Sequence, residues 1–427
     1  MNRQANLWRD TAPSAFDAPP LDGDVSTDVV VIGAGFTGCS AALHLAEAGV
    51  SVRLIEAETI GHGGSGRNVG LVNAGLWVPP DSVEATLGAE IGRRLNNALA
   101  SGPAEVFAIV ERLGIEAEAK RNGTLHCAHN ARGLRDLERR AAQQLKRQAP
   151  VELLDAAETA RRTGSTRFHG ALLDRRAGTI QPLAYVRGLA RAASAAGVHI
   201  HEKTSALDFN HDGTQWKVRT PGGQISAKHL IQATNAYECR TNQPDTYTPV
   251  YFFQFATEPL TRELGDNILP GGEGCWDTDT VMSSFRMDAD GRLIIGAIGN
   301  LESFGGSIHE SWAQRKLPHL FPKLTSVPFQ HAWHGRIAMT SDHLPQVSDI
   351  GPNAISIHGY SGRGIGPGTV FGKAAAEWVT SNNPDAFPLP IDPLVKERFP
   401  RLKRLYYELG ASLVHFAKAR QLGTADH

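Results

Sequence analysis

Glycine residues with a regular spacing near the start of the chain could bring the backbone against a phosphate group. Gly33, Gly35 and Gly38 form the pattern G-x-G-x-x-G, and Glu56 follows it. In this pattern the first glycine permits a tight turn, the second lets the backbone approach a pyrophosphate, and the third lets a helix pack closely on a strand. An acid placed like Glu56 accepts hydrogen bonds from a ribose hydroxyl. The chemistry indicated is the binding of a dinucleotide.

The elements that must position these residues are a strand, a helix and a second strand. Residues 28–32 are a short apolar run that predicts a strand, residues 39–48 predict a helix that ends at Gly49, and residues 50–55 predict the second strand. The helix N-terminus would offer free N–H groups and the positive end of its dipole to phosphates. A complete βαβ unit is much more specific than a glycine pattern alone.

A second glycine-rich segment, residues 61–75, follows directly and has five glycines in its first ten residues. Glycine brings no side chain to a core and loses more chain entropy on folding than other residues. The segment therefore predicts a loop laid against a planar or phosphorylated ligand. The alternative is an irregular surface loop.

Composition limits the classes of protein that the chain can belong to. Its 427 residues suggest two domains, and a formal net charge of −1 gives no sign of a nucleic-acid partner or an anionic membrane. The four cysteines form no CxxC pair, which suits a reduced compartment and excludes a cysteine-rich zinc site. The late histidines lack a metal-site spacing, so no metal is expected. Neither a signal peptide nor a membrane span is predicted, and a cytoplasmic enzyme is the expectation.

Four motifs together resemble the D-amino-acid oxidase superfamily of FAD enzymes, in particular the branch that holds γ-glutamylputrescine oxidase and bacterial L-pipecolate oxidase. They are GAGFTG (33–38), GGSGRNVG (63–70), IQATNAY (231–237) and HGYSGRGI (358–365). Three further segments look more like L-pipecolate oxidase than like the putrescine-pathway enzyme. They are GTLHCAHNARG (123–133), ALLDRRAGT (171–179) and LPGGEGCWDT (269–278).

The resemblance implies an α/β fold. A doubly wound, Rossmann-like FAD-binding domain would be assembled from discontinuous segments, with an inserted mixed β-sheet substrate domain. The expected division is an N-terminal extended arm (1–24), the FAD-binding domain (25–80, 150–240 and 335–400), the substrate domain (81–149 and 241–334) and a C-terminal helix or tail (401–427). Docking on the body is the first expectation for the tail, ahead of subunit pairing or contact with a membrane.

The resemblance also implies which residues hold the cofactor. The first glycine turn would hold the pyrophosphate and Glu56 the adenosine ribose. Residues 362–366, which precede a helix expected over residues 369–381, would bring backbone N–H groups and a helix N-terminus to the flavin end that becomes anionic on reduction. The implied contacts are Gly33, Gly35, Phe36, Thr37, Gly38, Glu56, Ala57, Gly64, Ser65, Gly66, Arg67, Asn68, Val69, Gly70, Leu71, Thr234, Asn235, Ala236, Gly362, Arg363, Gly364, Ile365 and Gly366. Residues 334–347, where some relatives attach flavin through a cysteine, contain none, so FAD is expected to be non-covalent. His62 is a less favoured anchor.

Arginine suits a clamp for a substrate carboxylate because its planar fork matches two oxygens. Arg336 is the first candidate, since D-amino-acid and glycine oxidases have an arginine in a comparable late segment, and Arg67 and Arg286 are the others. L-pipecolate oxidase differs at this position, which leaves either the substrate or the role of Arg336 open. A structural pairing of Arg336 with an acid such as Asp342 is the alternative.

Aromatic residues could wall the substrate pocket. Tyr251, Phe253 and Phe255 would share one strand face, because side chains alternate along a strand, although such a stripe is more often core. Tyr360 and Trp77 belong to segments expected near the flavin.

The expected activity is FAD-dependent oxidation of the C–N bond of a small amine or amino acid to an imine. A cyclic amino acid such as L-pipecolate comes first, and γ-glutamylputrescine or another polyamine derivative is the alternative. Electrons would pass to O₂ or to an electron-transport acceptor. A non-catalytic dinucleotide-binding protein and a simple NAD dehydrogenase are the rival interpretations.

Overall fold

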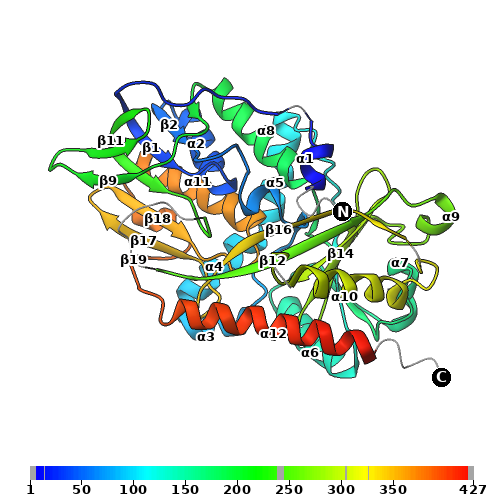
Figure 1. Ribbon diagram of the computed structural model, residues 1–427. Helices are drawn as coiled ribbons and strands as arrows, with labels where there is room; N and C mark the ends of the chain where they lie inside the picture. Colours follow the sequence, from blue (N-terminus) through cyan, green and yellow to red (C-terminus); the bar gives the residue numbers. More distant parts are fainter. Residues whose placement is uncertain (1–5, 14, 238–244, 303–304, 326, 422–427) are drawn as a thin grey trace.

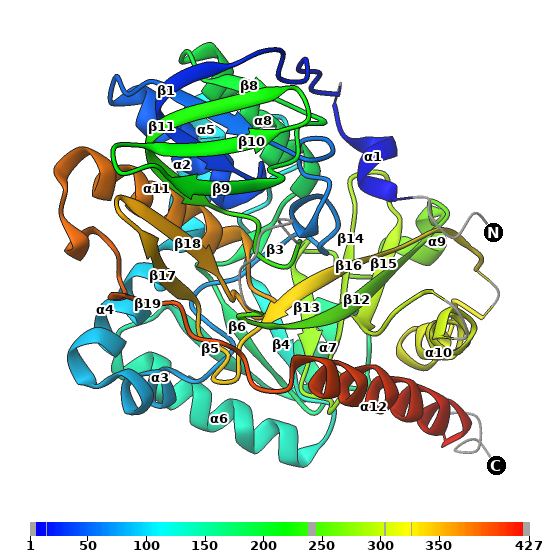
Figure 2. The same cartoon turned by 60° about the vertical axis from the view of Figure 1, so that its left-hand side comes forward.

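Two β-sheets lie side by side in the computed structural model, which describes residues 6–13, 15–237, 245–302, 305–325 and 327–421 (Figures 1 and 2). The first sheet has nine strands in the order β19-β17-β18-β11-β1-β2-β8, with β10 and β9 extending from β11. Its strands are β1 (Val25–Ile32), β2 (Val52–Ile55), β8 (His199–His201), β9 (Asp208–His211), β10 (Trp216–Thr220), β11 (Gly223–Gln232), β17 (Gln346–Gly351), β18 (Ala354–His358) and β19 (Ile391–Pro393).

The second sheet has eight strands in the order β16-β12-β15-β14-β13-β4-β6-β5. They are β4 (Thr124–Cys127), β5 (Val151–Leu154), β6 (Ala171–Asp174), β12 (Thr248–Thr257), β13 (Gly274–Asp277), β14 (Ser283–Met287), β15 (Leu293–Ile298) and β16 (Phe329–Met339). A short pair, β3 (Leu71–Val72) and β7 (Gly178–Thr179), completes the strands among the described residues.

The helices fall mainly into two groups, one on the first sheet and one around the second (Figure 1). They are α1 (Leu7–Thr11), α2 (Phe36–Glu47), α3 (Pro80–Leu87), α4 (Ala89–Ala100), α5 (Gly102–Leu113), α6 (Ala131–Lys146), α7 (Ala156–Thr163), α8 (Pro182–Ala195), α9 (Arg262–Gly265), α10 (Gly305–Leu320), α11 (Ile365–Ser381) and α12 (Pro400–Gln421). Within the described part of the chain, no helix has the length and apolar character needed to cross a bilayer.

The predicted βαβ unit is confirmed as β1, α2 and β2. The two strands pair in parallel, and β11 and then β18 continue the parallel arrangement on the other side of β1. The helix begins at Phe36, three residues before the expected start, because its first turn follows directly on the glycine turn. The mixed α/β architecture expected from the resemblance is therefore present.

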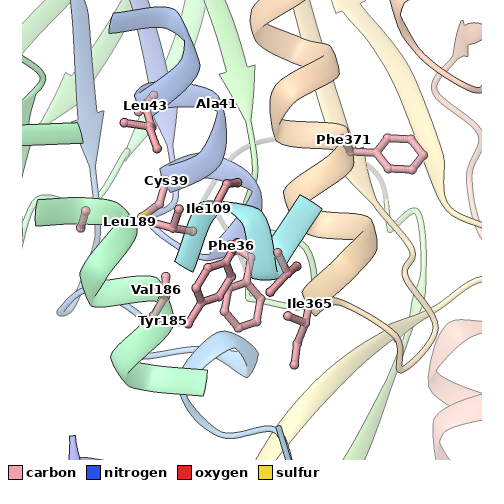
Figure 3. Close-up of a cluster of buried hydrophobic side chains, with 14 of the residues drawn as sticks. Phe36, Cys39, Ala41, Leu43, Ile109, Tyr185, Val186, Leu189, Ile365 and Phe371 are labelled. Atoms are coloured by element: carbon pink, nitrogen blue, oxygen red, sulfur yellow. The ribbon is translucent and has the colours of Figure 1, made fainter. Parts of the chain in front are cut away.

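Helices α2, α5, α8 and α11 form the main apolar core on the first sheet (Figure 3). The Phe36 and Tyr185 rings lie 5.6 Å apart between α2 and α8, and Phe371 of α11 is fully buried. This packing fixes the N-terminal ends of α2 and α11, which both point toward the site described below.

The division of the chain differs from the expected one between residues 150 and 174. Strands β5 and β6 fall in a range expected to belong with the nucleotide-binding part, but β6 pairs with β4 and β5 pairs with β6 in the eight-stranded sheet. Hydrogen bonding of β6 to β4 decides the position of this antiparallel pair, and a linear sequence does not reveal which distant strand will be the partner.

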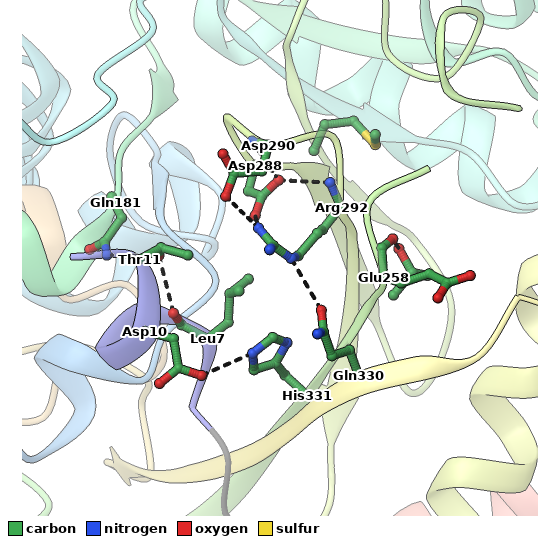
Figure 4. A network of polar contacts seen from close by, with 12 residues as sticks. Leu7, Asp10, Thr11, Gln181, Glu258, Asp288, Asp290, Arg292, Gln330 and His331 are labelled. Carbon is green, nitrogen blue, oxygen red and sulfur yellow. Dashed lines mark hydrogen bonds and ion pairs between the residues drawn. The ribbon is translucent and has the colours of Figure 1, made fainter. Parts of the chain in front are cut away.

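The N-terminal arm is not simply extended, because α1 forms within it and buries Leu7 and Trp8. Trp8 is 0% exposed, and its indole N–H donates to the carbonyl of Asn68 at 2.8 Å. Asn6 donates to the carbonyl of Gly66 at 2.8 Å, and Asp10 pairs with His331 of β16 at 3.0 Å (Figure 4). The arm therefore braces the second glycine-rich segment from outside.

Candidate functional site

A cavity of about 750 Å³ lies where the two sheets meet. The first sheet contributes the turn after β1, the end of β2 and the segments after β11 and β18, while β12, β13, β14, β15 and β16 contribute the opposite wall. Its volume falls in the range of small-molecule and cofactor sites. Segments far apart in the sequence thus form one site.

The first glycine turn leaves no room for side chains. Gly33 has φ +101, and a Cβ there would lie 2.9 Å from the carbonyl oxygen of Ala233. A Cβ on Gly38 would lie only 1.9 Å from the carbonyl oxygen of Gly33, so α2 packs directly on the turn. Gly35 faces Ser65, whose Oγ would lie 2.8 Å from an added Cβ. These contacts agree with the roles that the spacing predicts.

Glu56 is held in place at the end of β2. The backbone N–H groups of Ala34 and Glu58 donate to its two carboxylate oxygens at 2.9 and 3.1 Å. Burial raises the pKa of this carboxyl above its ordinary value, since a low-dielectric environment disfavours the charged form. Glu56 lines the cavity, and each of its two carboxylate oxygens already accepts one hydrogen bond from the backbone.

The segment from Gly61 to Gly75 is a tightly bonded wall rather than an irregular surface loop. The N–H of Phe36 donates to Ser65 Oγ at 3.0 Å, which joins the segment to the start of α2. Asn68 Oδ1 accepts from the N–H of Gly70 at 2.9 Å, and Asn68 Nδ2 donates to the carbonyl of Gly64 at 2.9 Å. The segment therefore presents a fixed backbone to the cavity.

The turn after β18 completes this side of the cavity. Asn235 accepts a hydrogen bond from the N–H of Gly359 at 3.1 Å, and the hydroxyls of Thr37 and Tyr360 lie 2.7 Å apart. The start of α11 at Gly364 has no side-chain cap, so its first N–H groups are available to a ligand. Three predicted cofactor segments thus meet here.

Most of the predicted cofactor residues line the cavity. The exceptions are Gly38, Gly66, Arg67, Gly70 and Ala236, which lie outside the lining. Those in the lining are Gly33, Gly35, Phe36, Thr37, Glu56, Ala57, Gly64, Ser65, Asn68, Val69, Leu71, Thr234, Asn235, Gly362, Arg363, Gly364, Ile365 and Gly366.

Arg286 and Arg67 do not line the cavity, and both support the backbone. Arg286 is 1% exposed and donates to the carbonyls of Ile180 and Gly70 at 2.7 and 3.2 Å. Burial lowers the pKa of Arg286 to about 10. Arg67 donates to the carbonyls of His62 and His334 at 2.7 and 3.1 Å. Neither guanidinium is placed to clamp a substrate, which corrects their inclusion as candidates.

Arg336 is the member of the predicted trio that lines the cavity. Its guanidinium lies 4.6 Å from the centre of the Tyr237 ring, a cation–π contact. The alternative ion pair with Asp342 is absent among the described residues, and Asp342 instead accepts from the N–H of Leu344 at 3.0 Å. Because Arg336 forms no ion pair with the described residues, its charge is available to an anionic group.

Phe253 and Phe255 belong to the core, as the alternative interpretation of the aromatic stripe held, and their proposed place in the pocket wall is wrong. Phe253 and Phe255 are 0% and 2% exposed, and Phe253 stacks on His309 of α10 at 4.7 Å. Alternation along β12 turns Phe252 and Gln254 into the cavity instead. The helix layer covers the face with the larger apolar surface, and the face with a glutamine is left for the site.

Tyr251 also lies outside the lining, with the guanidinium of Arg404 stacked 5.2 Å from its ring centre. Tyr360 and Trp77, the aromatic residues of the segments expected near the flavin, both line the cavity. Tyr251 thus packs against α12 rather than against a ligand.

Several residues of the cavity lining were not predicted from the sequence. Two residues of the lining also carry a buried polar atom that has no hydrogen-bond partner among the described residues. These atoms are Gln254 Oε1 and Trp77 Nε1. A polar residue within the apolar run 250–256 was the available signal for Gln254. The missed lining residues from the strands of the second sheet are Phe252, Gln254, Trp276, Ser284, Ala297, Ile298, Ile337 and Met339.

Arg363 forms a second cationic group in the lining. Its side chain donates to the carbonyls of Ala74 and Gly75 at 3.0 and 3.2 Å, and the guanidinium lies 4.9 Å from the centre of the Trp276 ring. His126 stacks on the same ring at 3.4 Å. Burial lowers the pKa of Arg363 to about 9. Arg363 was predicted to contact the cofactor, and its guanidinium also contacts Trp276 of the second sheet.

These features fit a dinucleotide cofactor. Close-packed glycines, two helix N-termini without side-chain caps and a fixed carboxylate suit phosphates and a ribose. Among the lining residues, Gln254 of β12 offers an unpartnered acceptor and Trp77, in the segment between β3 and α3, an unpartnered donor. None of the described cysteines, Cys39, Cys127 and Cys275, lines the cavity.

Comparison with known proteins identifies the family. The family model for FAD-dependent oxidoreductases matches residues 28–378. A probable oxidoreductase OrdL of Rhizobium meliloti is 33% identical over 372 residues, which are 86% of each chain. The γ-glutamylputrescine oxidoreductase of Escherichia coli is 30% identical over 409 residues, covering 91% of this chain and 94% of the relative.

Solved structures show the same fold. Glycine oxidase from Geobacillus kaustophilus superposes with a TM-score of 0.69 at 20% identity, covering 83% of this chain and 95% of that one. L-Proline dehydrogenase from P. horikoshii gives a TM-score of 0.70 at 20% identity, covering 85% and 95%. The chain therefore belongs to the D-amino-acid oxidase family of FAD-dependent oxidoreductases, enzymes that act on the C–N bonds of amines and amino acids.

Proposed function

We propose that this enzyme oxidises the C–N bond of a small amine that also carries a carboxylate. The observation that carries the proposal is the distribution of charge in the cavity. The two acids among the described lining residues, Glu56 and Glu58, both follow the end of β2. The two arginines of the lining lie elsewhere: Arg336 is on β16, and Arg363 is in the turn between β18 and α11. Two cations without an acidic partner favour an anionic substrate group there.

The protein's own residues bind and orient such a substrate. FAD supplies, when bound, the two-electron acceptor for the C–N bond. Trp77, Phe252 and Trp276 give the cavity apolar surface that excludes water, and the Gln254 oxygen can accept from an amine N–H. Because positioning supplies much of the rate, no general base is needed in this account.

The substrate that we place first is an extended amine of the γ-glutamylputrescine type. Support comes from the Escherichia coli relative, which matches this chain along almost its entire length. Such a molecule carries a carboxylate at one end and an amine at the other, so one arginine could hold it at a distance from the reacting bond. L-Pipecolate is the second candidate, and it rests on the resemblance of the segments 123–133, 171–179 and 269–278.

A substrate panel tests the proposal. The holoenzyme is mixed without oxygen with γ-glutamylputrescine, putrescine, L-pipecolate, D-pipecolate and the methyl ester of L-pipecolate, and the rate of flavin reduction is measured. We expect carboxylate-bearing amines to react at lower concentration than putrescine or the ester. Equal rates at equal concentrations for the amines with and without a carboxylate would contradict the binding of that carboxylate by an arginine.

The affinity for FAD is expected to fall as the pH is lowered through the pKa of Glu56. Burial raises the pKa of this carboxyl, and a ribose hydroxyl donates to its ionised form. Tight binding is therefore present above the raised pKa and is lost progressively below it. Fluorescence titration of the apoprotein with FAD across pH would measure this, and Glu56→Gln should bind about tenfold more weakly with a flatter profile. A wild-type affinity independent of pH would contradict the assigned role.

A further inference from the structure

The C-terminal helix carries most of the exposed bulky apolar side chains among the described residues. Eight of the ten large hydrophobic residues that are exposed lie between Val395 and Phe416. We use the name α12 stripe for six of them, whose i, i+3, i+4 and i+7 spacing places them on one side of the helix: Leu402, Leu405, Tyr406, Leu409, Leu413 and Phe416. Their exposed fractions run from 50% for Leu405 and Phe416 to 75% for Tyr406. Contiguous exposure of this kind marks an interaction surface.

The opposite face of α12 explains the position of the helix but not the stripe. Ala411 and His415 are 3% and 1% exposed, and the His415 ring stacks on Trp312 of α10 at 4.4 Å. The tail thus docks on the body as predicted, along the outside of the second sheet (Figures 1 and 2). Docking fixes which face points outward, and that outward face is the apolar one.

The exposed charges that accompany the stripe are cationic. Lys396, Arg398 and Arg401 are exposed and form no ion pair with the described residues. The two acids between residues 395 and 416 are already neutralised, since Glu397 pairs with Lys403 and Glu408 with Arg404. The chain as a whole has a net charge of −1, so this local excess of positive charge is hidden in the overall composition.

We propose that the α12 stripe, with Lys396, Arg398 and Arg401 beside it, docks the enzyme on a membrane surface that contains anionic lipids. A helix with one apolar face and cations beside it lies in the interfacial plane, where burial of the apolar face and attraction to anionic headgroups act together. The chain would lie on the bilayer rather than span it. A second copy of the chain is a poorer fit, because a two-fold contact between identical stripes offers these cations no complementary charge.

The docking helix is separated from the cavity by a single strand. Phe253 of β12 packs against His309 and His415, whereas its neighbours Phe252 and Gln254 line the cavity. Arg404 of α12 likewise stacks on Tyr251 of the same strand. The membrane-facing surface would therefore lie directly behind the substrate wall of the site.

Vesicle flotation with the FAD-loaded enzyme tests the proposal. The probes are vesicles of phosphatidylcholine alone and of an equal mixture of phosphatidylcholine and phosphatidylglycerol. We expect binding to the anionic mixture, weaker binding to the neutral vesicles, and release as the salt concentration rises. The double variant Leu409→Glu with Leu413→Glu should lower the partition coefficient about tenfold or more. The double variant Arg398→Gln with Arg401→Gln should lower it about tenfold on anionic vesicles alone.

The matched control is Leu145→Glu, which places the same substitution at an isolated leucine of α6 that is 57% exposed. It should bind vesicles like the wild type, and all variants should retain FAD and its reduction by substrate. Absence of binding to anionic vesicles, or equal binding by the arginine variant, would overturn the proposal. So would a wild-type dimer that the leucine variant converts to a monomer without any vesicle binding, because that result assigns the stripe to a second copy.

Discussion

Replacing Gly38 by alanine is expected to give a protein that does not retain FAD. A Cβ at this position would lie 1.9 Å from the carbonyl oxygen of Gly33 and 3.3 Å from Cγ1 of Val31. Both are parts of the β1 strand and its turn, so relief requires the start of α2 to move away from the sheet. Overpacking of this kind costs about 3 kcal/mol or more when backbone must shift. The flavin content of the purified variant and its thermal unfolding midpoint measure the effect.

The control for this change is Gly410→Ala in α12, where an added Cβ meets nothing within 4 Å. Alanine favours a helix over glycine, so this variant should be at least as stable as the wild type and should bind FAD normally. A Gly38→Ala protein with full flavin content would show that close packing of α2 on the turn is not required for the cofactor site.

The Arg336→Ala variant is expected to raise the KM for a carboxylate-bearing amine by about 30-fold or more, with a smaller change in kcat. The wild-type guanidinium lines the cavity and has no acidic partner among the described residues, so a substrate carboxylate would meet an unneutralised charge. Charge-assisted hydrogen bonds of this kind contribute about 1.5–3 kcal/mol. Steady-state kinetics with γ-glutamylputrescine and with L-pipecolate measure the change.

Arg336→Lys keeps the charge but loses the planar fork, and should fall between the wild type and the alanine variant. Putrescine, which lacks a carboxylate, should show little difference among the three proteins. If the KM for carboxylate-bearing amines stays unchanged in Arg336→Ala, the clamp must be sought at Arg363, the other cation in the lining.

The part of the site around the first glycine turn could be read from the sequence because local geometry fixes it. The turn at Gly33, the packing at Gly38 and the acid at Glu56 lie within one βαβ unit, and each requirement follows from neighbours along the chain. The turn at 359–366 was instead assigned through the resemblance of its motif to the family, and the structure shows that it links β18 to the N-terminus of α11.

The substrate wall could not be predicted in the same way because tertiary packing decides it. Alternation in β12 shows that Phe252 and Phe253 face opposite sides, but only the position of α10 and α12 determines which side is core. Arg286 has a plausible sequence context, yet the folded chain surrounds it with backbone carbonyls. Trp276 enters the site through pairing of β13 with β4, a contact between distant segments.

The most direct test of the central claim is an anaerobic titration of the purified holoenzyme with a carboxylate-bearing amine, followed by the visible absorption of the flavin. The account predicts a yellow protein with non-covalent FAD, released by denaturation, whose absorption band is bleached completely by the substrate and returns with an electron acceptor. A colourless protein, or a flavin band that none of the amines in the panel bleaches, would contradict it.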